Sequence, residues 1–202
     1  MSGSGVQESG YAWDVFLSYS RWARWPEWID KHFKPLFEHY LGEELARPPR
    51  IYVDRENRQP GPWPSALGKA LSSARVLVPL LSRTYYTSPW CRSEYDLMKL
   101  RSEQCGCALI LPAVIHDGGE GRFGHAEGLD WLDLKPFANP AISEGSITRE
   151  GLGRDIGDWT PRVASAIQAA PPHDAAWQEM HVDAMTEIYE QSVQKRLPGW
   201  GQ

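Results

Sequence analysis

Residues 76–95 read VLVPLLSRTYYTSPWCRSEY, a buried-strand pattern that passes directly into a helix start. The first six residues are apolar, as in a strand covered on both faces. Ser88 is a good N-cap and Pro89 suits the first helical position, so we predict that a helix begins there. Trp90 and Glu94 then lie four residues apart on one helix face. Because ligands of open α/β sheets bind beyond the carboxyl ends of the strands, this aromatic–carboxylate pair indicates a candidate active site.

Strand and helix patterns alternate from Trp13 to about Ala169. This alternation predicts an α/β fold with a parallel sheet and right-handed crossovers. Pro35 is expected to kink or split the first helix. The expected strands are 14–19, 50–54, 75–81, 108–115 and 131–134, and the expected helices are 25–41, 64–74, 89–104 and 159–169.

The end of the chain predicts an appendage to this domain. Pro171-Pro172 ends the α/β pattern, and apolar residues from Trp177 to Val193 indicate one amphipathic helix. We therefore divide the chain into a flexible N-terminus (1–11), a domain (12–170) and a C-terminal helical extension (171–202). The helix either packs on the domain or forms a surface for self-association or for a protein partner.

Composition argues against several classes of partner. The 202 residues contain 21 Lys and Arg against 26 Asp and Glu, which does not favour nucleic acid binding. No apolar run has the length of a membrane span, and Met1-Ser-Gly-Ser-Gly lacks the regions of a signal peptide. Cys91, Cys105 and Cys107 do not form the pattern of a disulfide framework. We expect a cytoplasmic protein with reduced thiols and no nucleic acid or membrane partner.

Three segments resemble the three sequence boxes of the Toll/interleukin-1 receptor (TIR) domain. They are Asp14-Val-Phe-Leu-Ser-Tyr-Ser20, the loop 55–61 that ends in Pro60-Gly61, and the segment 82–94. The resemblance implies a flavodoxin-like sheet of five parallel strands with helices on both faces. It also implies one of two functions: NAD cleavage by an essential glutamate in a W-x-x-x-E or S-x-x-x-E segment, or signalling by association. Glu94 matches the position of that glutamate.

A lone carboxylate suits the cleavage of NAD. The nicotinamide leaving group is already cationic, so its departure needs no general acid, unlike that of an ordinary glycoside. An anion beneath the ribosyl centre stabilises an oxocarbenium-like transition state, and the nearby helix amino terminus favours the ionised form of Glu94. We expect Trp90 to stack on a heteroaromatic ring of the substrate.

The resemblance supplies further candidate contacts. Ser20, Arg21 and Gln59 resemble nucleotide-contacting positions of the family, and Arg21 is suited to pair with a phosphate. Ser18 and Ser82 stand at strand ends. There they either contact the ligand or satisfy backbone groups.

These observations predict an NAD glycohydrolase or ADP-ribosyl cyclase that self-associates through TIR domains, in bacterial antiphage immunity or signalling. NAD is the substrate, and no cofactor is expected. No metal is expected either, because His116, Asp117 and His125 match no known ligand spacing. The alternative is a non-catalytic adaptor or effector that acts through TIR–TIR interaction, with the loop 55–63 and the C-terminal helix as its surfaces.

Overall fold

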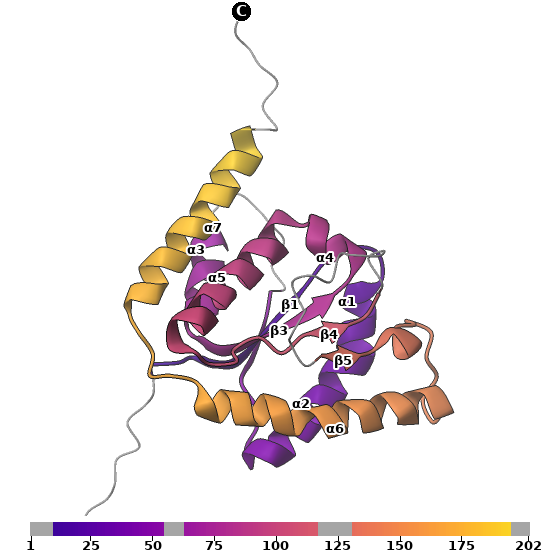
Figure 1. Cartoon of the computed structure of the whole chain (residues 1–202). Coiled ribbons are helices and arrows are strands. Elements are labelled where there is room, and N and C mark those ends of the chain that lie inside the picture. Colours follow the sequence, from indigo (N-terminus) through magenta and orange to yellow (C-terminus); the bar gives the residue numbers. More distant parts are fainter. Residues whose placement is uncertain (1–9, 55–62, 117–130, 195–202) are drawn as a thin grey trace, which may run out of the picture.

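The computed structural model describes residues 10–54, 63–116 and 131–194 (Figure 1). One sheet of five parallel strands has the order β2-β1-β3-β4-β5. This order confirms the predicted flavodoxin-like α/β fold. The strands are β1 (Trp13–Tyr19), β2 (Ile51–Val53), β3 (Ala74–Leu81), β4 (Ala113–Val114) and β5 (Leu132–Asp133).

Helices cover both faces of the sheet, as predicted (Figure 1). Helices α2 and α6 lie against one face, and α3 and α5 lie against the other. The described helices are α1 (Trp25–Trp28), the π-helical η1 (Ile29–Phe33), α2 (Lys34–Leu45), α3 (Trp63–Ser72), α4 (Arg83–Thr87), α5 (Pro89–Cys105), the 3₁₀ turn η3 (Lys135–Phe137), α6 (Ile147–Ala169) and α7 (Ala176–Gln194).

Successive side chains of β1 enter two separate apolar cores. Val15 and Leu17 pack with residues of α2 and α6, whereas Phe16 packs with residues of α3 and α5. All three side chains are at most 1% exposed. Because both faces of the sheet are covered, the strand is apolar throughout instead of alternating with polar residues.

The fourth strand is shorter than the sequence indicates. We predicted a strand over 108–115, but only Ala113–Val114 form β4, with one isolated bridge between Leu77 and Ile110. Pro112 lies between these two pairings and has no backbone N–H to donate. The ladder is therefore interrupted, although all residues from Leu109 to Ile115 are buried.

Helix α6 begins twelve residues before the predicted start at Trp159, at Ile147. Ser146 caps it, since its hydroxyl accepts from the backbone N–H of Arg149 at 3.1 Å. Glycines weaken the helical pattern of this stretch in the sequence, but they are needed for close packing. A Cβ on Gly151 would lie 2.9 Å from the Phe137 ring.

The first helix is divided, as Pro35 predicts. The π-helical turn η1 separates α1 from α2, and Pro35 lies in the first turn of α2. Proline there lacks the N–H that a continuous α-helix would require. Helix α2 then runs to Leu45, four residues beyond the predicted end.

The C-terminal helix α7 packs on the domain. Gly68 allows α3 and α7 to approach closely, because a Cβ there would lie 2.7 Å from the Cα of Val182. His181 and Met185 of α7 are fully buried. The sequence left open whether this helix packs on the domain or forms a surface for association, and in the structure it packs on the domain.

Tyr11 corrects the expectation of a flexible N-terminus over 1–11. Its side chain is 3% exposed, and its hydroxyl donates to the carbonyl of Pro171 at 2.9 Å. Residues 1–9 lie outside the described residues. The chain is thus held at Tyr11, against the start of the C-terminal extension.

The carboxyl ends of neighbouring strands meet at one edge of the sheet. Ser18 of β1 is in register with Pro79 of β3, and Leu81 of β3 is in register with Val114 of β4. Strand β2 lies on one side of β1 and β3 on the other, so the chain reverses its direction across the sheet at β1. Ligands of open α/β sheets bind at such a switch point.

Candidate active site at the carboxyl edge of the sheet

Glu94 lies beside the end of β1 and is 5% exposed. The hydroxyl of Ser18 donates to Glu94 Oε2 at 2.5 Å and lies 3.0 Å from the hydroxyl of Tyr85. A serine hydroxyl has one proton, which Ser18 gives to Glu94, so Tyr85 must be the donor to Ser18. The three residues form a hydrogen-bond chain from Tyr85 through Ser18 to Glu94.

Serine side chains cap the two helices, α4 and α5, that carry Tyr85 and Glu94. Ser88 caps α5 by accepting from the backbone N–H of Cys91 at 3.3 Å, with Pro89 in the first turn, as predicted. Ser82 caps α4 by accepting from the backbone N–H of Tyr85 at 3.2 Å. The second cap orients the first turn of α4, so the Tyr85 ring is buried against the end of β1.

Tyr85 remains a protonated donor. Burial raises the pKa of its phenol well above the ordinary value, and the nearby Cys91 and Glu94 raise that pKa further. The hydrogen bond with Ser18 acts in the opposite direction but is a smaller effect. Tyr85 was not among the site residues predicted from the sequence. Its place three residues after Ser82, the cap of α4, fixes its position on the helix but does not indicate which side chain it meets.

Trp90 is part of the apolar core. Its side chain is 6% exposed, and its ring meets the ring of Trp63 edge-on, with centroids 4.5 Å apart. The small exposed part lines a shallow hollow that α7 shares through Ile188 and Gln191. The Trp90 ring packs against protein in this structure, so its stacking on a substrate ring stays a prediction.

Arg21 connects the ends of two strands. Its guanidinium donates to the backbone carbonyl of Asp54 and lies 3.3 Å from the Asp54 carboxylate. Trp63 Nε1 donates to the same carboxylate at 3.2 Å. The side chain of Arg21 is still 28% exposed, so it can also meet a ligand. Gln59, the third candidate for nucleotide contact, lies outside the described residues.

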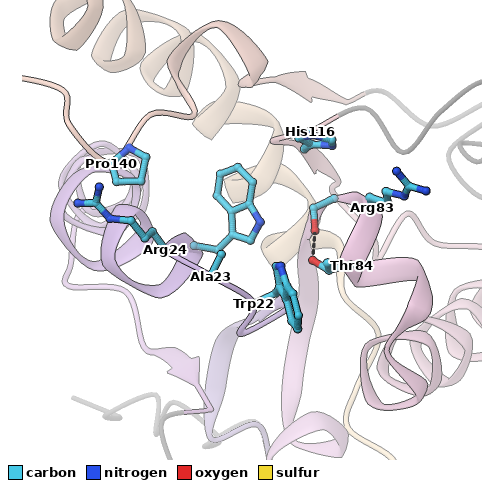
Figure 2. A pocket seen from close by; sticks show the side chains of 9 residues that line it. Trp22, Ala23, Arg24, Arg83, Thr84, His116 and Pro140 are labelled. Carbon is cyan, nitrogen blue, oxygen red and sulfur yellow. Dashed lines mark hydrogen bonds between the residues drawn. The ribbon is translucent and has the colours of Figure 1, made fainter.

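Two adjoining hollows open at this edge. The Ser20 hollow, of about 620 Å³, is lined by Ser20, Arg21, Trp22, Thr84, Thr87, Ser88 and Pro89. The His116 hollow, of about 490 Å³, is lined by Trp22, Ala23, Arg24, Trp25, Ser82, Arg83, Thr84, His116 and Pro140 (Figure 2). Trp22 and Thr84 line both, so the two hollows are neighbours.

The structure places the described candidate residues other than Trp90 in three groups. Ser18 and Glu94 are in direct contact, and Ser20 and Arg21 line the Ser20 hollow. Ser82 both caps α4 and lines the His116 hollow, so the backbone role considered for it is realised. Among the lining residues that the structure describes, Glu94 belongs to neither hollow.

Residues 10–54, 63–116 and 131–194 contain neither a candidate metal cluster nor a helix suited to span a membrane. In those ranges no group of three His, Cys, Asp or Glu side chains is placed to hold a metal ion. Asp117 and His125, considered with His116, lie outside them. No helix in the part of the chain that the structure describes is long and apolar enough to cross a membrane.

One protein family matches more than half of the chain. A model of the TIR domain family matches residues 15–144. Among solved structures, the chain is similar to the TIR domains of the activated Roq1 resistosome, which directly recognises the pathogen effector XopQ. That similarity covers 90% of this chain and 99% of the other, with 18% sequence identity and a TM-score of 0.37. No curated protein matches the sequence.

Proposed function

Because the chain belongs to the TIR domain family, we propose that it cleaves NAD to nicotinamide and ADP-ribose, in linear or cyclic form. The observation that carries the proposal is the hydrogen-bond chain from Tyr85 through Ser18 to Glu94. It holds a carboxylate at the switch point of the sheet, where ligands of this fold class bind. We further propose that the protein acts in the cytoplasm, in antiphage immunity or signalling.

The proposed reaction breaks the bond between the ribose anomeric carbon and the nicotinamide nitrogen. The bonding electron pair moves to that nitrogen, which neutralises the pyridinium, so no proton has to be supplied to the leaving group. The Glu94 carboxylate stabilises the positive charge that develops on the ribosyl centre. Water then captures this centre and loses a proton, or an adenine nitrogen captures it and closes the cyclic product.

Ser18 and Tyr85 act as positioning residues in this proposal. The hydroxyl of Ser18 fixes one oxygen of Glu94, and Tyr85 fixes the hydroxyl of Ser18. Arg21 and Ser20 face the adjoining hollow, where a pyrophosphate and a ribose hydroxyl have polar partners. The substrate is thereby held by groups that the fold has already oriented, which lowers the entropic cost of reaction.

Access to Glu94 requires a change in its surroundings. Glu94 as a whole is 5% exposed, so we propose that neighbouring side chains move before ribose reaches its carboxylate. We therefore propose that activity depends on self-association, with contacts between TIR domains favouring the open arrangement. Specific activity is then expected to rise with protein concentration. A turnover number that is constant over a wide dilution range, with a monomer throughout, would contradict this dependence.

The same burial favours a second candidate function, a non-catalytic association module. In that case the bond between Ser18 and Glu94 ties β1 to α5, and Trp90 is a core anchor. The two candidates differ in whether the chain turns over NAD at all. Removing the charge of Glu94 would then change stability or association but no chemical rate.

The test is incubation of the purified full chain with NAD, followed by chromatographic separation of nicotinamide, ADP-ribose and cyclic products. Glu94→Gln keeps the size of the side chain and an acceptor oxygen for Ser18, so it is expected to fold and to release no nicotinamide. The matched control is Glu103→Gln, an exposed carboxylate on the same helix that pairs with Lys99 at 3.9 Å. A wild-type chain that leaves NAD intact at every concentration would favour the association module.

A further inference from the structure

We infer that the His116 hollow binds the adenosine end of NAD, so that the dinucleotide spans both hollows. This inference rests on the proposed function for its choice of ligand. The scissile bond must lie near Glu94, and the Ser20 hollow borders the first residues of the helix that carries Glu94. The nicotinamide end therefore belongs to the Ser20 hollow. The other end must extend into the neighbouring space that shares Trp22 and Thr84.

The aromatic lining suits a planar heteroaromatic ring. Trp22 is 67% exposed, an unusual exposure for so large an apolar ring. Trp25 and His116 add two more rings, edge-on to each other with centroids 6.4 Å apart. Figure 2 shows the labelled side chains of Trp22, Thr84 and His116 around the opening. An adenine ring that stacks on Trp22 would cover this exposed surface.

The polar lining suits the edge of a base, a ribose and a phosphate. The hydroxyls of Ser82 and Thr84 lie 3.1 Å apart and can each bind one further group. His116 is exposed and has two ring nitrogens for hydrogen bonding. Together they offer donors and acceptors at the side of the hollow that adjoins β3 and β4.

The charges at the hollow favour an anionic ligand. The lining residues that the structure describes include two arginines and no aspartate or glutamate. Arg24 already binds Glu27 at 2.8 Å. Arg83 forms no ion pair with the residues that the structure describes, and Figure 2 shows its guanidinium at the rim, directed away from Trp22. Arg83 is thus available for a phosphate at the edge of the hollow.

The first experiment measures binding of AMP, which carries only the adenylate end, to the full-length protein by calorimetry. AMP is expected to bind wild type and Glu94→Gln alike, because Glu94 is not needed for this end. Trp22→Ala is expected to weaken binding about 5- to 150-fold, the loss of one aromatic–base stack. Trp131→Ala is the matched control, since Trp131 is 45% exposed and lines neither hollow. AMP binding that Trp22→Ala and His116→Ala leave unchanged would overturn the inference.

The second experiment connects the hollow to catalysis. Trp22→Ala is expected to raise KM for NAD by the same factor. His116→Ala, at a residue that lines the His116 hollow but not the Ser20 hollow, is expected to raise KM for NAD and to leave KM for nicotinamide mononucleotide, which lacks the adenylate end, unchanged. AMP is expected to inhibit NAD cleavage competitively. Non-competitive inhibition would mean a separate nucleotide site and would overturn the spanning arrangement. If wild type bound AMP through Trp22 but never cleaved NAD, the proposed function would fail while the nucleotide site stood.

Discussion

Helix α5 buries two charged side chains two turns apart, Glu94 near its start and Arg101 further along, and the protein holds them in different ways. Arg101 donates to the backbone carbonyls of Leu71, Ser72 and Ala74 at 3.2–3.5 Å. Glu94 accepts from the hydroxyl of Ser18, a side chain at the edge where ligands bind. Carbonyls of the main chain cannot turn away, whereas a hydroxyl can.

Their surroundings differ in the same sense. The guanidinium of Arg101 lies 4.0 Å from the ring centroid of Trp177, so α7 closes over it. Its burial lowers its own pKa, although the hydrogen bond with Tyr11 opposes that effect. We conclude that Arg101 is a structural charge that joins α5, α3 and α7. Under the proposed function, Glu94 is the buried charge on this helix that side-chain motion releases for chemistry.

The largest expected effect sharpens the comparison at the Glu94 end. Trp90→Ala removes a buried ring from the core and is expected to lower the free energy of unfolding by about 3–5 kcal/mol. Trp90→Phe is expected to lower it less, because a ring remains in the core. Denaturant unfolding measures the loss, and nicotinamide release per folded molecule is measured on the same variants. If Trp90→Ala kept full stability but lost turnover, the ring would serve the substrate and not the core.

The next effect tests the Arg101 end. Arg101→Ala leaves three carbonyls without their donor and is expected to cost about 3 kcal/mol of stability, at roughly 1 kcal/mol for each. Lys99→Ala on the exposed side of α5 is the control and is expected to change stability by less than about 0.5 kcal/mol. An Arg101→Ala protein as stable as wild type would remove the structural role assigned to this charge.

Acid is expected to destabilise the docked C-terminal helix through His181. Burial, with a smaller effect of Arg101, lowers the pKa of His181 from 6.5 to about 3. The unfolded chain therefore binds this proton at a higher pH than the folded chain. Stability is complete above pH 6.5 and decreases as the pH falls towards 3, by about 2 kcal/mol between roughly pH 7 and pH 5. Denaturant unfolding measured across this range checks the slope, and His181→Gln should flatten it. An unchanged slope in that variant would assign the acid sensitivity to other groups.

The smallest effect concerns the hydrogen-bond chain. Tyr85→Phe removes the donor to Ser18 and is expected to lower NAD turnover about fivefold, which corresponds to one hydrogen bond of roughly 1 kcal/mol, with KM little changed. Ser18→Ala acts directly on Glu94 and should lower turnover at least as much. Tyr86→Phe is the control, because it removes a neighbouring hydroxyl of α4 that is not part of the hydrogen-bond chain from Tyr85 to Glu94. Equal turnover in all three variants would mean that the hydrogen-bond chain from Tyr85 to Glu94 plays no part in catalysis.

Local signals predicted the parts of the fold that local chemistry controls. The Ser88 cap, Pro89 and the apolar run of β3 each have one favourable conformation, and the structure confirms them. The predicted length of the fourth strand was wrong, because Pro112, just before β4, has no backbone N–H for the ladder. The start of α6 was missed because Gly151 and the other glycines of this stretch weaken the helical pattern in the sequence, although close packing requires them.

The candidate site was predictable only in part, because its contacts depend on tertiary register. Glu94 was identified from its helical spacing to Trp90 beyond a buried strand and from family resemblance, and its partner Ser18 was proposed as a strand-end contact. Tyr85 was not proposed, since a tyrosine on a five-residue helix gives no sign of which side chain it meets. Arg101 was also not proposed, because an arginine in a polar helix normally indicates a solvated face. Only the fold brings three carbonyls and an indole to it.

The contrast between the two buried charges is tested most directly by nicotinamide release from NAD per folded molecule, in Glu94→Gln and Arg101→Lys side by side. The account predicts that Glu94→Gln unfolds like wild type but loses at least about a hundredfold in rate, as when a group that stabilises transition-state charge is removed. It predicts that Arg101→Lys is less stable yet keeps the wild-type rate in its folded fraction. A Glu94→Gln protein that released nicotinamide at the wild-type rate would contradict the account.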